Sequence, residues 1–287
     1  MMKAAVIVKP KYSIKDNVLN VIEILNKYNI DILLEQQSVS MLDLNISGYK
    51  SDDIKNMADF AIVLGGDGTL LYASRILSSS QIPILTFNLG RLGFIIENEI
   101  LDFEKVLSDY LSNQLLSQNR MKLEGIIQTK NGDVIFKENA LNDIVISKGA
   151  PSRMIELIIY IDGCFVTKYR SDGAIISTST GSTGYTISAG GPIVHPDLDN
   201  IIFLPICPHA LNIRPIVLSG NSKISITIET PNTDCSITYD GQIVKEFSAG
   251  SLLSVQKSQS SLNLVVNPER NYYNILRSKL GWGDISC

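Results

Sequence analysis

The sequence predicts an α/β domain followed by a β-rich, sandwich-like domain, and three observations support this division. Strand and helix patterns alternate through the first hundred residues, which is typical of a parallel sheet covered by helices. From residue 120 onward, short strand-like runs follow one another, joined by turns such as Asp162-Gly163. Asp240-Gly241 lies between two further apolar runs and indicates a tight hairpin. The 287 residues are enough for two ordinary domains.

Residues 1–119 are predicted to form the doubly wound, Rossmann-like α/β domain. Its parallel strands are expected at Lys3–Val8, Asp31–Glu35, Phe60–Leu64 and Ile82–Phe87. Helices are expected from residue 14 to 25 with Ser13 as N-cap, over Thr69–Leu77 and over Leu101–Leu116. The uniformly apolar run Phe60–Leu64 is typical of a central strand that is buried on both faces. Residues 268–287 are predicted to be a helical tail that packs back on this domain.

Residues 120–267 are predicted to form the β-rich domain. The runs with strand character are Leu123–Thr129, Val134–Ser147, Met154–Ile161, Cys164–Arg170, Ala174–Ile176, Ile216–Leu218, Lys223–Glu229, Cys235–Tyr239, Leu252–Gln256 and Leu262–Val266. Many short strands separated by turn residues are typical of a sandwich.

Composition excludes several classes of function. The net charge is −4 without a dense Lys/Arg cluster, so a nucleic-acid partner is not expected. No apolar run approaches the roughly 20 residues needed to span a bilayer, and the N-terminus lacks the pattern of a signal peptide. The four cysteines are far apart, without metal-ligand spacing, which favours thiols in a reducing compartment. A cytoplasmic protein is therefore expected.

The segment Gly65-Gly66-Asp67-Gly68-Thr69 directly follows the predicted central strand. Glycines let a ligand approach the backbone closely, and a helix that begins at Thr69 as its cap would attract phosphate. Asp67 would lie where open α/β sheets bind their ligands. A carboxylate beside an anion site suits a Mg²⁺ ligand or a base for an attacking hydroxyl. The alternative is an aspartate that only caps the helix.

Two weaker polar signals lie elsewhere in the chain. Phe87-Asn88-Leu89-Gly90 through Gly93-Phe94 follows the fourth strand and could face the same crevice, although an ordinary loop is an equally good interpretation. Asn142-Asp143 interrupts an apolar segment, where polar groups need partners. Either backbone groups satisfy this pair at a bulge, or the pair binds the hydroxyls of a ribose.

The segment from Arg170 to Gly191 is rich in hydroxyl residues and glycine and surrounds a short buried strand. It offers small hydrogen-bonding groups, such as Thr183 and Ser188, for a base or ribose, and Tyr185 for ring stacking. A flexible linker is the alternative. No GxxxxGK[ST] or GxGxxG phosphate-binding pattern is present, and each of the two histidines adjoins prolines in a loop, which favours a structural role for both.

Together these segments resemble the NAD kinase family, the ATP–NAD 2′-phosphotransferases of the bacterial type, over nearly the whole chain. The Gly-Asp motif alone is shared with other kinases, whereas the Thr/Gly-rich motif from Asp172 to Ser188 is the specific one. The segment Asn212-Ile213-Arg214-Pro215-Ile216-Val217 is also similar to the family. Gly184 and Ser179 depart from it, since Ala and Pro are usual at those positions.

The resemblance implies an active site in the crevice between the two domains, where Asp67 accepts the proton of the adenosine-ribose 2′-hydroxyl as it attacks ATP. It implies Mg²⁺ or another divalent cation carried by ATP rather than by a direct protein cage, and a homodimer or homotetramer. The residues implied to hold NAD⁺ are Asp67, Gly68, Asn142, Asp143, Arg153, Arg170, Asp172, Thr183, Gly184, Tyr185, Thr186, Ile187, Ser188 and Gln242. Phe87 and Asn88 are further candidates.

Two other functions stay open at this point. A lipid kinase of the diacylglycerol or sphingosine type shares the two-domain plan, but usually has Asn-Glu where this chain has Leu70-Leu71. A non-catalytic dinucleotide sensor would use Asp67 only as a helix cap. Use of polyphosphate, acceptance of NADH and inhibition are not decided by the sequence.

Overall fold

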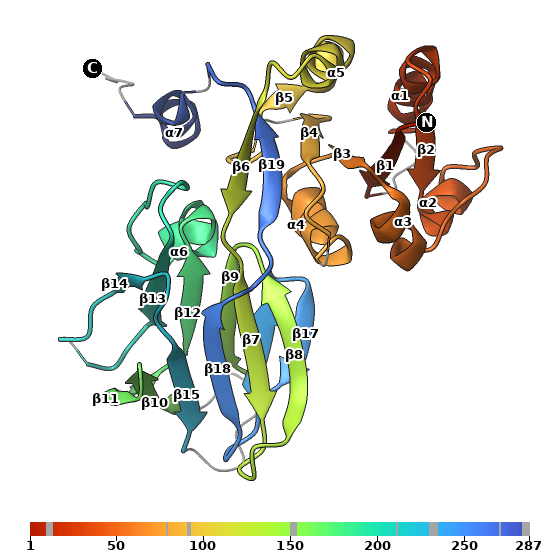
Figure 1. The fold of residues 1–287 in the computed structure, drawn as a ribbon. Helices are drawn as coiled ribbons and strands as arrows, with labels where there is room; N and C mark the ends of the chain where they lie inside the picture. Colours follow the sequence, from red (N-terminus) through yellow and green to blue (C-terminus); the bar gives the residue numbers. More distant parts are fainter. Residues whose placement is uncertain are drawn as a thin grey trace. The chain divides into compact units, whose positions relative to one another are not determined.

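The computed structural model describes residues 1–9, 14–78, 80–90, 93–149, 154–210, 212–229, 235–269 and 271–282 (Figure 1). The chain forms two compact units, each with its own hydrophobic core. Unit 1 consists of Met1–Asn119 with Leu262–Cys287, and unit 2 of Arg120–Ser261. No helix among these described residues is long and apolar enough to cross a membrane.

Unit 1 is built on a seven-stranded sheet with the strand order β2-β1-β3-β4-β19-β6, in which β5 also pairs with β4. The pairs β1–β2, β1–β3, β3–β4, β4–β19 and β4–β5 are parallel. The strands are β1 (Lys3–Val8), β2 (Asp31–Leu34), β3 (Phe60–Leu64), β4 (Ile84–Asn88), β5 (Asn98–Glu99), β6 (Leu116–Arg120) and β19 (Leu262–Val266). The order 2-1-3-4 is doubly wound, with its topological switch point between β1 and β3.

Helices cover both faces of this sheet because its strands are apolar on both sides. The helices are α1 (Lys15–Lys27), α2 (Gln36–Met41), α3 (Ser51–Met57), α4 (Asp67–Ile76), α5 (Phe103–Leu111) and α7 (Tyr272–Leu280), with a 3-10 turn at Ile100–Asp102. Helices α1 and α5 pack on alternate strand residues such as Phe60 and Phe87. Helices α3 and α4 lie on the opposite face (Figure 1).

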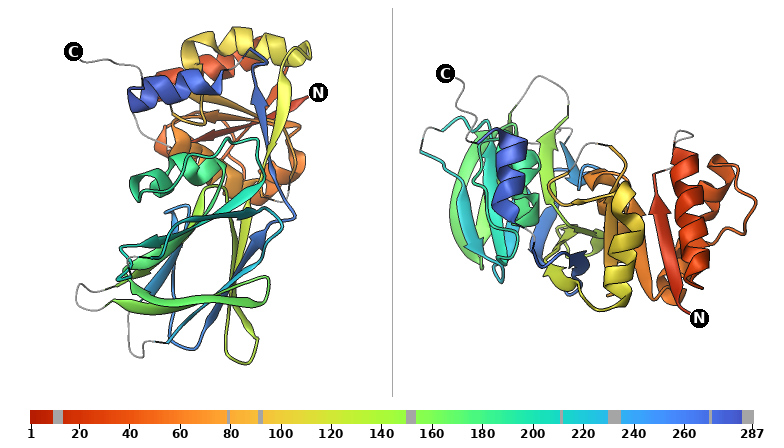
Figure 2. Two further views of the ribbon diagram at one scale, coloured as in Figure 1. Left: turned by 90° about the vertical axis from the view of Figure 1, so that its left-hand side faces the viewer. Right: turned by 90° about the horizontal axis from the view of Figure 1, so that it is seen from above.

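Unit 2 is a sandwich of two six-stranded sheets whose pairings are antiparallel (Figure 2). The first sheet has the order β11-β10-β15-β18-β7-β8, and the second β14-β13-β12-β9-β16-β17. Their inner faces share one apolar core, and the Tyr239 ring of the second sheet meets Phe136 of the first with centroids 5.6 Å apart. These two units confirm the fold class that the sequence predicts.

The strands of the first sheet are β7 (Leu123–Gln128), β8 (Val134–Ala140), β10 (Ile155–Ile161), β11 (Cys164–Ser171), β15 (Ile224–Ile228) and β18 (Leu252–Lys257). Those of the second are β9 (Asp143–Lys148), β12 (Gly173–Thr178), β13 (Asn200–Ile206), β14 (Ile216–Ser219), β16 (Cys235–Tyr239) and β17 (Ile243–Glu246). A 3-10 turn (Thr180–Thr183) and the single-turn helix α6 (Tyr185–Ser188) follow β12.

Several local predictions were wrong. The run Val134–Ser147 is two strands in different sheets, divided at residues 141–142. Strand β19 pairs with β4 in unit 1 rather than completing the β-rich unit. The central strand β13 was missed, since Pro205 weakens its pattern; Pro205 lies beyond the stretch that pairs with β14. Helices α2 and α3 were also missed, and the predicted cap Ser13 lies outside the described residues.

Candidate functional site

In unit 1, the chain turns sharply from β3 into α4 at Gly65 and Gly66. Gly65 has φ +152°, and a Cβ atom there would lie 2.4 Å from the Thr69 hydroxyl oxygen, so only glycine fits. Gly66 is the N-cap, without a side-chain cap hydrogen bond, and Thr69 is buried inside the helix. The expectation that Thr69 caps this helix was therefore wrong: the helix begins two residues earlier, at Asp67.

The carboxylate of Asp67 is held by the loop that follows β4. Its Oδ2 accepts a hydrogen bond from the Phe94 amide at 2.9 Å, and its Oδ1 accepts from Ile95 and Ile96 at 3.3 and 3.2 Å. These donors belong to another segment, and the cap position is Gly66, so Asp67 is not an ordinary helix cap. Three donors fix the direction of the carboxylate and leave it capacity for one further hydrogen bond.

Gly93 allows this carboxylate to approach the loop. A Cβ atom on Gly93 would lie 2.0 Å from Oδ1 of Asp67 and 2.6 Å from its Cγ. The loop that follows β4 therefore requires glycine at position 93, and the sequence did not reveal this requirement. Asn88 accepts from the amide of Gly90 at 3.0 Å and so closes its own turn. Phe87 is fully buried against Phe103, with ring centroids 4.8 Å apart, so the structure places it in the core.

In unit 2, Asn142 and Asp143 lie where the chain passes from β8 in the first sheet to β9 in the second. The carbonyl of Asn142 accepts hydrogen bonds from the Thr178 amide at 2.9 Å and the Ser177 hydroxyl at 3.0 Å. A Cβ atom on Gly181 would lie 2.1 Å from this carbonyl oxygen. The hydroxyl- and glycine-rich loop after β12 is therefore packed directly on the turn at residues 141–143, and it is not a flexible linker.

The turn at residues 141–143 presents buried polar groups whose hydrogen-bonding capacity is not filled by the described residues. Oδ1 of Asn142 is buried without a hydrogen-bond partner there. Asp143 is 6% exposed, and burial, with a smaller contribution from the charge of Asp240, raises the pKa of Asp143 to about 7. The Cβ position of Gly184 is 3.4 Å from Nδ2 of Asn142 and 3.8 Å from Oδ2 of Asp143. Buried polar atoms of this kind suit a ligand that brings hydroxyl donors.

The remaining residues of the Thr/Gly-rich segment differ in how far they are exposed. The Tyr185 ring is 48% exposed and Ser188 is exposed, so both are open to a ligand. Thr183 donates to the Thr180 carbonyl at 3.3 Å. Thr186 is fully buried and its hydroxyl has no partner among the described residues. Ile187 and Gly184 are half-buried.

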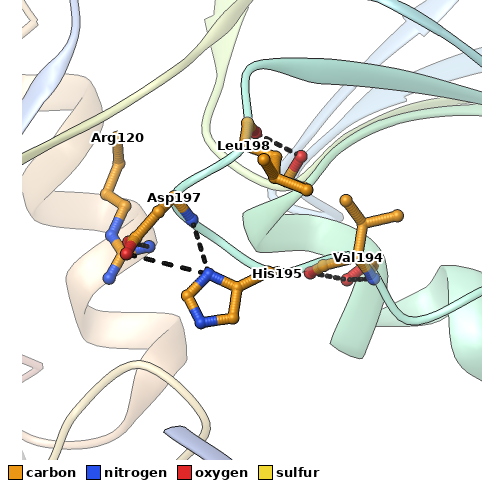
Figure 3. A network of polar contacts seen from close by, with 7 residues as sticks. Arg120, Val194, His195, Asp197 and Leu198 are labelled. Atoms are coloured by element: carbon orange, nitrogen blue, oxygen red, sulfur yellow. Dashed lines mark hydrogen bonds and ion pairs between the residues drawn. The ribbon is translucent and has the colours of Figure 1, made fainter.

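Buried serines anchor this segment to the loop at residues 194–198. The Ser182 hydroxyl accepts from the amide of Val194 and donates to its carbonyl, both at 3.1 Å. Ser179 donates to the carbonyl of Leu198 at 2.5 Å. The same loop carries Asp197, whose carboxylate lies 3.4 Å from the buried Arg120 guanidinium (Figure 3). These contacts give the serines a structural role.

The structure does not bring Arg170 and Asp172 to the Asn142 turn. Both precede β12, whereas the Thr/Gly-rich loop follows it, and a six-residue strand spans about 20 Å. Arg170 pairs with Glu156 at 3.6 Å, and Asp172 with Lys148 at 2.6 Å.

Gln242 is exposed, on the hairpin whose strand β16 pairs with the Asp143 end of β9. Arg153 lies outside the described residues. Sequence reasoning missed Asp240, whose carboxylate accepts three backbone hydrogen bonds from residues 141–143; the Asp-Gly pair indicated only a hairpin.

Comparison with known proteins gives consistent matches over most of the chain. Residues 5–115 match the ATP-NAD kinase N-terminal domain family, and residues 141–267 the ATP-NAD kinase C-terminal domain family. The chain is 42% identical over 241 residues to the NAD kinase of Geobacter metallireducens, covering 84% of this chain and 85% of that protein.

Two solved structures are also similar. Yeast NADH kinase complexed with NADH has a TM-score of 0.91 and 27% identity, covering 99% of this chain and 89% of that one. An Archaeoglobus fulgidus NAD kinase in complex with ATP has a TM-score of 0.77 and 28% identity, covering 98% of this chain and 99% of that one.

Proposed function

This chain belongs to the NAD kinase family, and from that premise we propose how its residues perform the reaction. The reaction transfers the γ-phosphoryl group of ATP to the 2′-hydroxyl of the adenosine ribose of NAD⁺. The bond from that oxygen to phosphorus forms, the bond to the β-phosphate oxygen breaks, and ADP leaves. The observation that carries the assignment is the carboxylate of Asp67, which three backbone amides orient and which the described residues leave with one lone pair open.

Asp67 accepts the proton of the 2′-hydroxyl as the new bond forms. A neutral hydroxyl keeps its proton in the ground state, so proton transfer must accompany bond formation, and orientation contributes most of the rate enhancement. Three hydrogen bonds to the 94–96 backbone keep the carboxylate from turning away from the substrate. Gly68 lies beside it with open space at its Cβ position, which leaves room for substrate.

Asn142 and Asp143 bind the hydroxyl groups of the nucleoside, since the Asn142 oxygen is buried without a partner among the described residues. The exposed ring of Tyr185 stacks on a base, and Thr183 and Ser188 supply further hydrogen bonds. Gly184, Thr186 and Ile187 shape this part of the site. Arg153, Arg170, Asp172 and Gln242 are assigned to NAD⁺ from the family resemblance alone.

We expect the divalent cation to arrive at the site bound to ATP. Among the described residues no group of three or more His, Cys, Asp and Glu side chains is placed to hold a metal. Mg²⁺ or another divalent cation would be held by the triphosphate oxygens of ATP, so that the remaining lone pair of Asp67 stays available for the proton of the 2′-hydroxyl. When bound, the cation neutralises the charge on the phosphates.

We also propose a homo-oligomer in a reducing, cytoplasmic setting. Strands β8 and β11, at the two edges of the first sheet, expose apolar side chains such as Val134 and Phe165, and exposed edges of this kind can pair with a second copy. The three cysteines that the structure describes are free thiols. Sedimentation equilibrium at micromolar concentration tests this proposal. A monomer under these conditions would exclude the oligomer.

A coupled assay for NADP⁺ formed from NAD⁺, ATP and Mg²⁺ tests the proposed reaction. Formation of NADP⁺, abolished by EDTA and restored by added Mg²⁺, is the expected result. Binding of NAD⁺ without product would support a sensor instead, and phosphorylation of diacylglycerol or sphingosine without NADP⁺ would support a lipid kinase. The same assay with NADH or polyphosphate decides whether either replaces the expected substrate.

Replacing Gly68 with Ala separates ligand binding from stability. A Cβ atom at Gly68 meets nothing within 4 Å, and alanine is the better residue in a helix, so the free energy of unfolding should rise by up to about 1 kcal/mol. The methyl group would nevertheless occupy space proposed for substrate. We therefore expect the KM for NAD⁺ or ATP to rise several-fold in a protein with an unchanged or higher Tm. Unchanged kinetics would remove Gly68 from the site.

A further inference from the structure

One carboxylate organises the backbone of the Asn142 turn. Oδ2 of Asp240 accepts a hydrogen bond from the Leu141 amide at 2.9 Å, and Oδ1 accepts from Asn142 at 2.7 Å and from Asp143 at 3.2 Å. The amide of Asp240 donates in return to the Asp143 carbonyl at 2.9 Å. Leu141 and Asn142 lie between β8, which ends at Ala140, and β9, which begins at Asp143. The hydrogen bonds that Ser177 and Thr178 of β12 make to Leu141 and Asn142 reach their carbonyl oxygens rather than their amides.

The same carboxylate belongs to a group of charges at this end of unit 2. Lys122 is 1% exposed, and burial lowers its pKa to about 8 against the opposing charges of Asp240 and Glu138. Burial raises the pKa of Asp240 to about 6, although three backbone hydrogen bonds and Lys122 favour its ionised form. Asp143 faces the charge of Asp240 and has its pKa raised further by it. The charge of Asp240 therefore opposes the ionisation of the Asp143 carboxyl group, in addition to the effect of burial.

We propose that Asp240 is a positioning residue for NAD⁺: through three backbone hydrogen bonds it holds the turn at residues 141–143 in the conformation that presents Asn142 and Asp143 to the substrate. This inference rests on the proposed contact of Asn142 and Asp143 with NAD⁺. Asp240 acts through these two residues rather than by touching the reacting atoms.

The direction of the pH dependence follows from the raised pKa of Asp143. Above about pH 7 Asp143 is ionised and accepts hydrogen bonds from ribose hydroxyls. Below that pH it takes up a proton, and Asp240 follows at about pH 6, which weakens its hold on the three amides. NAD⁺ affinity should therefore fall as the pH is lowered from 8 to 5.5. NAD⁺ itself does not change charge in this range, so its binding in the absence of ATP reports on the protein.

The decisive variant is Asp240→Asn. Asparagine keeps the shape of the hairpin, because it tolerates the left-handed backbone at this position, where φ is +52°. The side-chain amide of asparagine has one acceptor oxygen, whereas the carboxylate has two. Its NH₂ group would face a backbone amide, and two donors cannot form a hydrogen bond with each other. Losing a charged partner of this kind should raise the Kd for NAD⁺ at pH 8 by about ten- to a hundredfold. Removing the neighbouring negative charge should also move the loss of affinity to lower pH.

Asp162→Asn is the matched control. Asp162-Gly163 is a second Asp-Gly hairpin in the same unit, with φ +51° at the aspartate, and its carboxylate accepts the Lys223 amide at 2.7 Å. The substitution makes the same change in charge and shape at a turn that does not contact residues 141–143. We expect its NAD⁺ affinity and pH profile to equal those of the wild type.

Calorimetric titration with NAD⁺ from pH 5.5 to 8.5, together with thermal unfolding of each variant, tests the proposal. An unchanged Kd in Asp240→Asn, or a raised Kd whose pH midpoint does not move, would overturn it. Should that variant fail to fold, the wild type alone suffices, since a flat pH profile contradicts the proposed titration. Asp143→Asn tests the premise separately: if it binds NAD⁺ as the wild type does, the contact is wrong, whether or not the enzyme still makes NADP⁺.

Discussion

Replacing Asp67 with Asn is expected to lower kcat by about 10²- to 10⁴-fold, the usual contribution of a positioned general base. The amide has almost the same shape but cannot accept the proton of the attacking hydroxyl. The proposed nucleoside contacts lie at Asn142 and Asp143, so NAD⁺ affinity should be nearly unchanged. Steady-state kinetics for turnover and calorimetry for NAD⁺ binding measure the two quantities independently.

The substitution also affects the loop that Asp67 holds, and this needs its own control. The carboxylate accepts amides on both oxygens, whereas asparagine offers one acceptor. Asp59→Asn makes the same change where a carboxylate accepts a backbone amide of unit 1, from Lys3 at 2.7 Å, and should leave kcat unaltered. Normal turnover in Asp67→Asn would exclude Asp67 from the mechanism. A matching loss of Tm and NAD⁺ affinity would assign Asp67 a structural role only.

The strand–turn–helix at the start of the site could be predicted because its causes are local. A uniformly apolar run marks a strand that is buried on both faces, and the glycines after it mark a turn that other residues cannot make. Gly65, with φ +152° and Thr69 against its Cβ position, is such a case. The placement of the helix cap was wrong because a glycine in extended conformation can take that position without any side-chain signal.

The groups that hold the functional side chains could not be predicted, since they are backbone amides distant in sequence. Asp67 accepts hydrogen bonds from amides 27 to 29 positions later in the chain. Asp240 accepts hydrogen bonds from amides 97 to 99 positions earlier in the chain. A backbone amide that donates a hydrogen bond cannot be recognised from the residue type at its position. For the same reason the run Val134–Ser147 looked like one strand, since the contacts that hold the turn between β8 and β9, such as those with Asp240, are distant in sequence.

Replacing Gly93 with Ala is expected to lower kcat by about 10²-fold, although residue 93 supplies no chemical group to the reaction. The new methyl carbon would lie 2.0 Å from Oδ1 of Asp67 and 2.7 Å from Oδ2, closer than atoms can approach. The carboxylate or the loop must shift by about an ångström, and a displacement of that size at a reacting group costs a factor of this order. NAD⁺ affinity should change little, so the loss appears in kcat.

Gly90→Ala separates this displacement from a general effect on the loop. Gly90 lies three residues earlier, and a Cβ atom there meets nothing within 4 Å. The two variants make the same substitution in one loop and differ in what the new methyl group contacts. We expect Gly90→Ala to retain wild-type kcat while Gly93→Ala loses it. Equal kcat in both variants would mean that the position of the Asp67 carboxylate does not limit the reaction, and the role of Asp67 as base would then fail even if Asp67→Asn is inactive.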